Sequence, residues 1–217
     1  MNYLELVKRA WTESSQSGGG PVSVVGMSGH QQKFVDWVRD AWVDIQQYSD
    51  EWVFLKNSAV CTLTSGQESV LSAILGIADL KKPLVVFIMV DGQWQQLPLS
   101  ISLSSSGEWS QVNKQSGRPT KVYFSNGSFS FDSIPDANYQ LKIHYVKSPQ
   151  ELMTNADTPW CDASYHRTIM WHAVKTYAAD DGDQALYNRA NMAYEAALMA
   201  MLSDLTPRFT FGASAFR

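Results

Sequence analysis

Cysteine is scarce in this 217-residue chain, which contains only Cys61 and Cys161. One disulfide between them is conceivable, but two thiols in a chain of this size are more typical of a reduced, cytoplasmic protein. Long hydrophobic runs are missing too, and no segment approaches the ~18 apolar residues of a membrane span. Residues 1–11 carry three charged side chains among apolar ones, unlike a secretory signal peptide. The sequence therefore predicts a soluble protein in a reducing compartment.

Charge of either sign is also limited. Charged residues make up 18% of the chain, and the formal net charge is −4. Proteins that grip DNA through its phosphates need a basic surface, so the composition argues against sequence-specific DNA binding. The composition does not argue against a protein that surrounds DNA without binding it. Eight Trp, nine Tyr and nine Phe are many for this length, and because large aromatics dominate cores and interfaces, they suggest oligomerisation.

Motifs for catalysis, cofactors and metals are missing from the sequence. There is no GxSxG elbow, no Walker loop, no GxGxxG after a strand and no CxxC or HxxxH pair. His166 and His172 are six residues apart, which does not place two ligands on one helix face. The glycines at 18–20 follow a helical pattern and are interpreted as a linker. We therefore predict no active site, no cofactor and no metal centre.

Helical periodicity marks both ends of the chain. Residues 2–14 form an amphipathic pattern, and a second helix is expected to open at Ser28, where Ser28 and Gln31 fit a capping box. The periodicity returns over residues 165–205, broken by the acidic segment 180–183. That segment lacks the alternating ligands of a calcium loop, so we interpret it as a turn that caps the next helix. The second helix carries a strong apolar stripe of Phe34, Trp37, Val38, Ala41, Trp42 and Ile45.

Between the helical ends, the pattern changes to the two-residue period of β-strands. Asn126-Gly127 and Asp91-Gly92 predict two hairpins, because both central residues of a type I′ turn need positive φ. The polar, Ser-rich segment 100–117 is expected to be a long loop. A two-residue turn fixes the register of the later hairpin and pairs Phe124 with Phe129 and Val122 with Phe131. The expected strands are residues 52–55, 59–63, 83–90, 93–97, 121–125, 128–131 and 139–146.

The end of the chain carries aromatic and cationic side chains outside any helical pattern. Pro207 ends the last helix, and the segment 208–217 that follows is too short to form a core. Exposed apolar groups mark interaction sites, so we expect this segment to be an arm that docks on a partner and is ordered there. Its arginines suit an acidic surface or carboxylates. The expected docking residues are Arg208, Phe209, Phe211, Phe216 and Arg217.

The order helix, strand, helix predicts an α+β protein. We expect a helical bundle, made of the N-terminal helices and a C-terminal helical hairpin, with an inserted antiparallel β-sheet or sandwich domain and an extended C-terminal arm. The expected parts are residues 1–50 (N-terminal helices), 51–147 (inserted β domain), 148–206 (helical hairpin) and 207–217 (arm).

Three stretches in this order carry a family resemblance: FVDWVRDAWVDIQ followed by EWVFLK, GRPTKVYFSNGSFSFDSIPDANYQLKIHYVKSP, and YHRTIMWHAVKTYAADDGDQALYNRANMAYEAALMAML. Together they resemble tailed-bacteriophage adaptor proteins, the head-to-tail connectors, over residues 3–205. The tail tubular protein A family of short-tailed phages is similar. The resemblance implies a virion structural protein without enzymatic activity, assembled in the host cytoplasm and located in the neck between head and tail.

The resemblance also implies partners. It implies a homo-oligomeric ring of twelve subunits beneath the portal protein, joined to a tail or nozzle protein. Double-stranded DNA would pass through this ring without specific binding, and no membrane is expected as a partner. The sheet would then face the tail, with Trp94 and Trp109 as candidate contacts, and the helices would form the ring wall. The arm at 208–217 would dock on the portal or on a neighbouring subunit.

Two other functions are compatible with the residues. One is a β-sandwich carbohydrate-binding module for a host surface, in which Trp94 and Trp109 form the sugar platform and the helices form an oligomerisation stalk. The other is a metal-dependent hydrolase that uses His166 and His172. Neither is supported by a specific motif, so the adaptor is the preferred interpretation.

Overall fold

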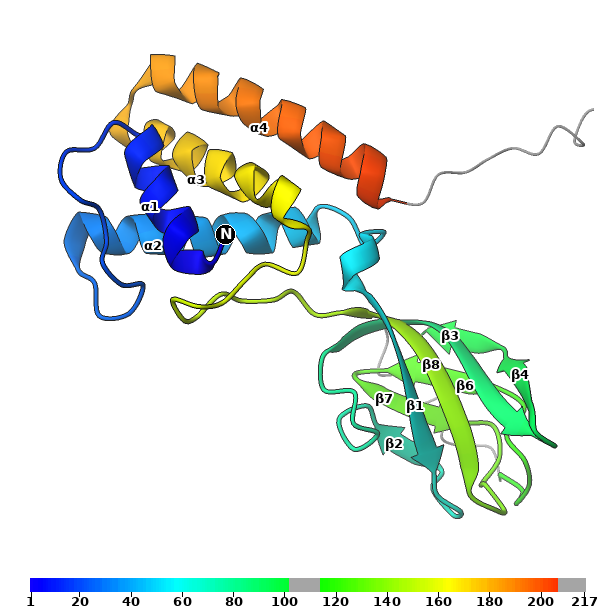
Figure 1. Ribbon diagram of the computed structural model, residues 1–217. Coiled ribbons are helices and arrows are strands. Elements are labelled where there is room, and N and C mark those ends of the chain that lie inside the picture. The colour runs from blue at the N-terminus through cyan, green and yellow to red at the C-terminus, as the bar shows by residue number, and fades with distance from the viewer. Residues whose placement is uncertain (102–113, 207–217) are drawn as a thin grey trace, which may run out of the picture. The chain divides into compact units, whose positions relative to one another are not determined.

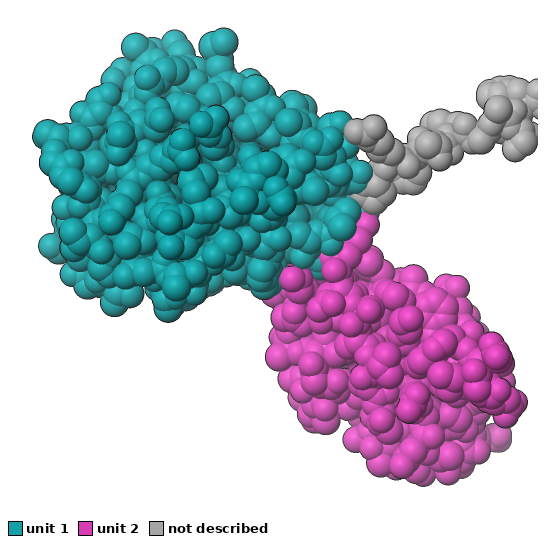
Figure 2. Space-filling model, in the orientation of Figure 1, with its two compact units in different colours: residues 1–55, 149–217 teal, residues 56–148 magenta. Residues whose placement is uncertain are grey.

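The chain folds into two compact units, each described here by itself. The computed structural model describes residues 1–101 and 114–206. Unit 1 joins residues 1–55 to the chain from residue 149 onward, and unit 2 is the intervening segment 56–148 (Figure 2). Unit 1 is helical and unit 2 is built from two sheets, which confirms the predicted α+β class. The finer division of the chain into four parts stays a prediction.

Four α-helices form the described part of unit 1 (Figure 1). Helix α3 contacts each of the other three and is therefore the centre of the bundle. Gly182 ends α3 in the left-handed conformation, and the carboxylate of Asp183 accepts the Leu186 N–H at 2.9 Å at the start of α4. The prediction that the acidic segment caps the next helix is confirmed. The helices are α1 (Tyr3–Glu13), α2 (Gly29–Gln47), α3 (His166–Asp181) and α4 (Gln184–Leu205).

The capping box lies on a different helix from the one expected. Ser28 precedes α2, but its side chain makes no capping hydrogen bond. The left-handed φ of Gly29, +58°, turns the chain directly after Ser28. A capping box forms instead on α1, where the Glu5 N–H donates to Asn2 Oδ1 at 2.9 Å and the Asn2 N–H donates to Glu5 Oε2 at 3.0 Å.

A 3-10 turn, η1 (Val53–Leu55), stands where a strand from Trp52 was expected. The Trp52 indole N–H donates to the Ile45 carbonyl at 2.8 Å and folds the chain back onto the end of α2. The ring of Phe54 stacks on those of Trp42 and Trp52, at centroid distances of 5.5 and 5.6 Å. The expected strand is wrong because burial of these large rings outweighs the local alternation.

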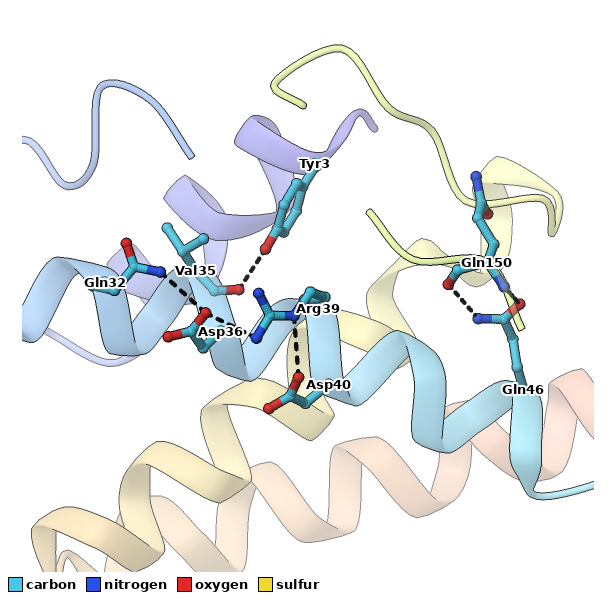
Figure 3. A network of polar contacts seen from close by, with 8 residues as sticks. All are labelled: Tyr3, Gln32, Val35, Asp36, Arg39, Asp40, Gln46 and Gln150. Atoms are coloured by element: carbon cyan, nitrogen blue, oxygen red, sulfur yellow. Dashed lines mark hydrogen bonds and ion pairs between the residues drawn. The ribbon is translucent and has the colours of Figure 1, made fainter. Parts of the chain in front are cut away.

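The chain returns from unit 2 to unit 1 where the backbone of the half-buried Gln150 meets the buried side-chain amide of Gln46 (Figure 3). Gln46 Nε2 donates to the Gln150 carbonyl at 2.9 Å, and the Gln150 N–H donates to Gln46 Oε1 at 2.8 Å. Gln150 Oε1 also accepts the indole N–H of Trp42 at 3.0 Å. The following loop then contacts α1, because the Asp157 carbonyl accepts the Tyr3 N–H at 2.7 Å. A second 3-10 turn, η2 (Ala163–Tyr165), leads into α3.

Unit 2 consists of two four-stranded sheets that enclose one apolar core. The first sheet, sheet A, has the order β1-β8-β3-β4, and the second, sheet B, has the order β2-β7-β6-β5. Large side chains from both sheets fill the core between them, among them Leu63, Ile88, Phe129, Phe131 and Ile143. The strands are β1 (Lys56–Leu63), β2 (Ser69–Leu71), β3 (Leu80–Val90), β4 (Gln93–Leu97), β5 (Leu99–Ile101), β6 (Val122–Ser125), β7 (Ser128–Phe131) and β8 (Tyr139–Lys147).

The predicted hairpin register is confirmed. Strands β6 and β7 pair Phe124 with Phe129 and Val122 with Phe131. Asn126 and Gly127 both have positive φ, at +48° and +75°, as do Asp91 and Gly92 in the β3–β4 hairpin. Strands β2 and β5 were not predicted, since three residues are too few to show alternation. The expected loop 100–117 therefore begins inside β5, which pairs in parallel with β6, and its residues 102–113 lie outside the described residues.

Two histidines of α3 lie inside unit 1. His166 is buried, with Nδ1 accepting from the Met1 amino group at 2.8 Å and Nε2 donating to the Cys161 carbonyl at 3.2 Å. His172 packs its ring edge-on against Tyr194 at 4.8 Å, and its Nδ1 is buried without a hydrogen-bond partner. Burial lowers the pKa of both rings from 6.5. Both are therefore held neutral by the fold.

The turn at Gly127 gives the first testable prediction. A Cβ at Gly127 would meet nothing within 4 Å, so the cost of Gly127→Val comes from the backbone alone, at φ +75°. We expect unit 2 to lose about 1 kcal/mol or more of unfolding free energy, while the helical signal of unit 1 persists. Urea unfolding followed by circular dichroism measures both. The matched control is Asn126→Gly, which keeps positive φ accessible and should be near parental; equal midpoints for Gly127→Val and the parent would contradict the type I′ turn.

The neutral histidines make the stability of unit 1 depend on pH. Because their folded pKa values lie below 6.5, their contribution is fully present above pH 6.5 and is lost as the pH falls through the folded values. The variant His172→Phe removes one of the two titrating rings, and it breaks no hydrogen bond at Nδ1 because this atom has no partner. We expect this variant to lose less thermal stability than the parent between pH 8 and pH 5. Thermal melts monitored at the helical band test this, and identical pH slopes would rule out burial of His172 as a cause.

Candidate interaction surfaces

Helix α4 carries apolar side chains on its exposed side as well as on its buried side, although charged residues such as Arg189 and Glu195 are exposed beside them. Its inner side buries Leu186, Ala190, Tyr194, Leu198 and Met201 in the bundle. On the opposite side, Met192 and Met199 are 72% and 60% exposed, with the exposed Ala196 between them. We call these three residues the α4 outer face; their spacing places them on one side of the helix. A surface helix normally turns a polar side to water, so an apolar outer side points to contact with a partner.

Sheet A of unit 2 presents Trp94, one of the predicted contact residues. Trp94 lies on β4, is 36% exposed and stands opposite Met89 of β3. The ammonium of Lys142 lies 6.0 Å from the centroid of its ring, within cation–π range. The other half of the expected sugar platform, Trp109, lies outside the described residues. No observation therefore joins the two tryptophans into one binding site.

The predicted docking arm is not described by the structure. Arg208, Phe209, Phe211, Phe216 and Arg217 all lie beyond residue 206, the last described residue of the chain. Their role stays a prediction. The described part of α4 ends in a capped turn, in which the Thr206 hydroxyl donates to the Leu202 carbonyl at 2.5 Å.

A hollow of about 830 Å³ lies along α2 and α3. Trp37, Asp40, Asp44, Glu151 and His172 are among the side chains that line it. His172 Nε2 lies 3.7 Å from the Asp44 carboxylate, but its ring is held neutral by burial, so the pair is not an ion pair near neutral pH. Arg39 also lines the hollow and pairs with Asp40 at 3.3 Å, so the charge of the acidic side chains is partly balanced. The hollow is therefore a mixed polar surface.

The remaining reactive residues are structural. No group of three His, Cys, Asp or Glu side chains within residues 1–101 and 114–206 could hold a metal ion. Both cysteines are free thiols, and burial raises the pKa of Cys61 to about 11 and that of Cys161 to about 12. Such thiols are almost wholly protonated near neutral pH and are poor nucleophiles. Among the described helices, none combines the length and apolar character needed to cross a bilayer.

Comparison with known proteins identifies the family. The sequence profile of the SU10 adaptor protein family matches residues 1–215, nearly the whole chain. No curated protein matches the chain significantly, and the narrower likeness to tail tubular protein A stays a prediction. The profile match agrees with the resemblance to phage adaptors, and at the level of the family it indicates a structural role rather than an enzymatic one. The chain belongs to the SU10 adaptor protein family.

Proposed function

We propose that the chain is one subunit of a head-to-tail adaptor ring, which joins the portal protein to the tail and surrounds the path of the phage genome. Family membership supports the adaptor role. The observation that carries the ring is the α4 outer face, because an apolar helix side with Met192 and Met199 exposed needs a partner surface. In the proposed ring, that partner is the neighbouring copy of the same chain.

The interface of a closed ring has two different sides. Each copy must contact its two neighbours through two non-identical patches. The rotation that relates one copy to the next must close the ring after a whole number of subunits. A helical bundle can supply such patches, since α4 offers one flank and helices α1 and α2 lie elsewhere in unit 1. We propose twelve copies, as the family resemblance implies.

The charge of the subunit suits a DNA conduit. One chain carries a formal charge of −4, so twelve copies carry about −48. A lumen with this sign repels the phosphates of double-stranded DNA and lets the genome pass without specific binding. We propose that unit 2 faces the tail with Trp94 and Trp109, and that the ring assembles in the host cytoplasm and remains in the virion neck, without contact with a membrane.

The arm at residues 208–217 is proposed to be the attachment to the portal. It contains three phenylalanines and two arginines and no acidic residue. Burying each ring contributes roughly 1.5–3 kcal/mol before ordering costs are counted. The arginines can form charge-assisted hydrogen bonds with carboxylates of the partner.

Removal of the arm tests the attachment. We expect a chain that ends at Pro207 to keep the parental fold and melting temperature, because the deleted segment is too short to form a core and follows the proline that ends the last helical pattern. Attachment to portal-bearing heads should be abolished. Binding of the truncated and parent chains to purified heads, measured by sedimentation, makes the comparison. Parental affinity of the truncated chain would assign portal binding to the helical unit instead.

Substitution on the α4 outer face tests the ring. In the variant Met192→Glu/Met199→Glu, both new carboxylates lie at exposed positions, so the unfolding free energy should change by no more than about 0.5 kcal/mol. Ring assembly on heads should fail, because the charges would be buried in the interface. The matched control is Val22→Glu, which adds the same charge at a 76% exposed apolar position of another segment. Electron microscopy of the necks gives the result, and normal rings in the double variant would exclude α4 from the interface.

A further inference from the structure

Sheet A of unit 2 ends in two strands that each have a single neighbour. Within the described residues, β1 pairs with β8 alone and β4 pairs with β3 alone. An edge strand presents a row of unpaired N–H and C=O groups to its surroundings, which is a template for another strand. In β1, the Ser58 N–H donates to Oδ1 of the Asn57 side chain at 2.9 Å.

The two edges carry few of the features that usually prevent such pairing. Proteins protect their edges with very short strands, prolines, lysines or β-bulges. Strand β1 has eight residues, its only charge is Lys56 at the first position, and β4 has neither charge nor proline. Both pair with their neighbours without a register shift. Sheet B differs, because its edge strands β2 and β5 have only three residues each.

Apolar side chains accompany both edges of sheet A on the same face. Val60 at the middle of β1 is 61% exposed. Val60 begins a row of paired residues that crosses sheet A. The row continues with Lys142 of β8, Phe87 of β3 and Gln96 of β4. The residues of this row share one face of the sheet, and Trp94 shares it with Gln96, two residues on. Val60 and Trp94 are therefore placed where a strand added to either edge would bring new side-chain contacts.

The strand directions fit a ring. All three pairings in the order β1-β8-β3-β4 are antiparallel, so β4 runs opposite to β1. A rotation about an axis along the strands keeps every strand direction. It places β1 of the next copy beside β4 of the first as an antiparallel neighbour, the pairing that sheet A already uses.

We propose that β4 of each copy pairs with β1 of the next copy, so that one antiparallel sheet continues through the units 2 of the whole ring. The proposal rests on the proposed adaptor ring and adds a second contact between copies, made by unit 2. Pairing of β1 with β1, or of β4 with β4, would close a dimer and leave one edge of each copy unpaired. The β4–β1 pairing uses both edges of sheet A in every copy, and in a closed ring sheet A then has no edge left.

Disulfide trapping tests this pairing in the full-length chain. The variant Val60→Cys/Gln96→Cys places thiols on the same face of the two edges, and oxidation of a concentrated solution should give a ladder of dimers, trimers and larger species that reduction removes. The control Val60→Cys/Gln95→Cys places the second thiol one residue away, on the opposite face, and should give a much weaker ladder. The parent chain sets the baseline, since burial keeps its two thiols protonated.

Three results would overturn the proposal. They are a double variant that gives no species above the baseline, a control that traps equally well, and a Val60→Cys single variant that alone gives dimers as efficiently as the pair. A further test adds the substitution Val60→Lys to the cysteine pair Ser58→Cys/Gln96→Cys. The lysine adds charge to the edge without changing the core, so this triple variant should give a weaker ladder than the cysteine pair alone. Attachment of the chain to portal-bearing heads is scored separately, so failure of strand pairing can be distinguished from failure of the adaptor role.

Discussion

The fold depends on the reciprocal hydrogen bonds between Gln46 and Gln150. The bonds join the side chain of Gln46 to the backbone of Gln150, and residues 56–148 leave and re-enter the helical unit between these two residues, so closing that long excursion requires a fixed point. Gln46 is fully buried, and a buried amide without partners costs free energy. The returning chain supplies the partner of the Gln46 acceptor, the Gln150 N–H, while the Gln46 donor is shared between the carbonyls of Gln150 and Trp42. Two distant segments are thereby held in one arrangement, and the helices from α3 onward pack against it.

Because the helical unit is closed in this way, the unit 2 sandwich can keep its own core. Its inner residues come from the two sheets and, at Ile77, from the connection between β2 and β3, and the helical unit has a separate centre in α3. The surfaces left over differ between the units. Unit 1 has an apolar helix side at Met192 and Met199, whereas sheet A of unit 2 has two edge strands that each pair with a single neighbour among the described residues. Each is a different means of binding another chain, by side-chain packing in one unit and by backbone pairing in the other.

Sequence reasoning succeeded where a local rule decides the structure. Asn126-Gly127 requires positive φ, and the register of β6 with β7 follows from it. It failed where tertiary contacts decide. Burial of the Trp52 ring replaced an expected strand, and Gly29 displaced the expected cap at Ser28. No pattern in the sequence indicates that Gln46 and Gln150 meet, since they are polar residues far apart in the chain. The outer side of α4 could have been noticed, because Met192 and Met199 interrupt what should be its polar side.

The α4 outer face and the edges of sheet A would promote aggregation of a monomer, but they can form the contacts of an assembly. An exposed helix side with two methionines and two edge strands with a single charge between them both favour unwanted association in solution. A closed ring removes both at once, because each copy covers its neighbour's surface and no copy is left at an end. The scarcity of charge fits the same constraint: further lysines on β1, beyond Lys56, or on β4 would protect the lone subunit, but they would also have to be desolvated between copies. The sequence of β4, QWQQL, answers that constraint with neutral amides, which can pair or stay hydrated.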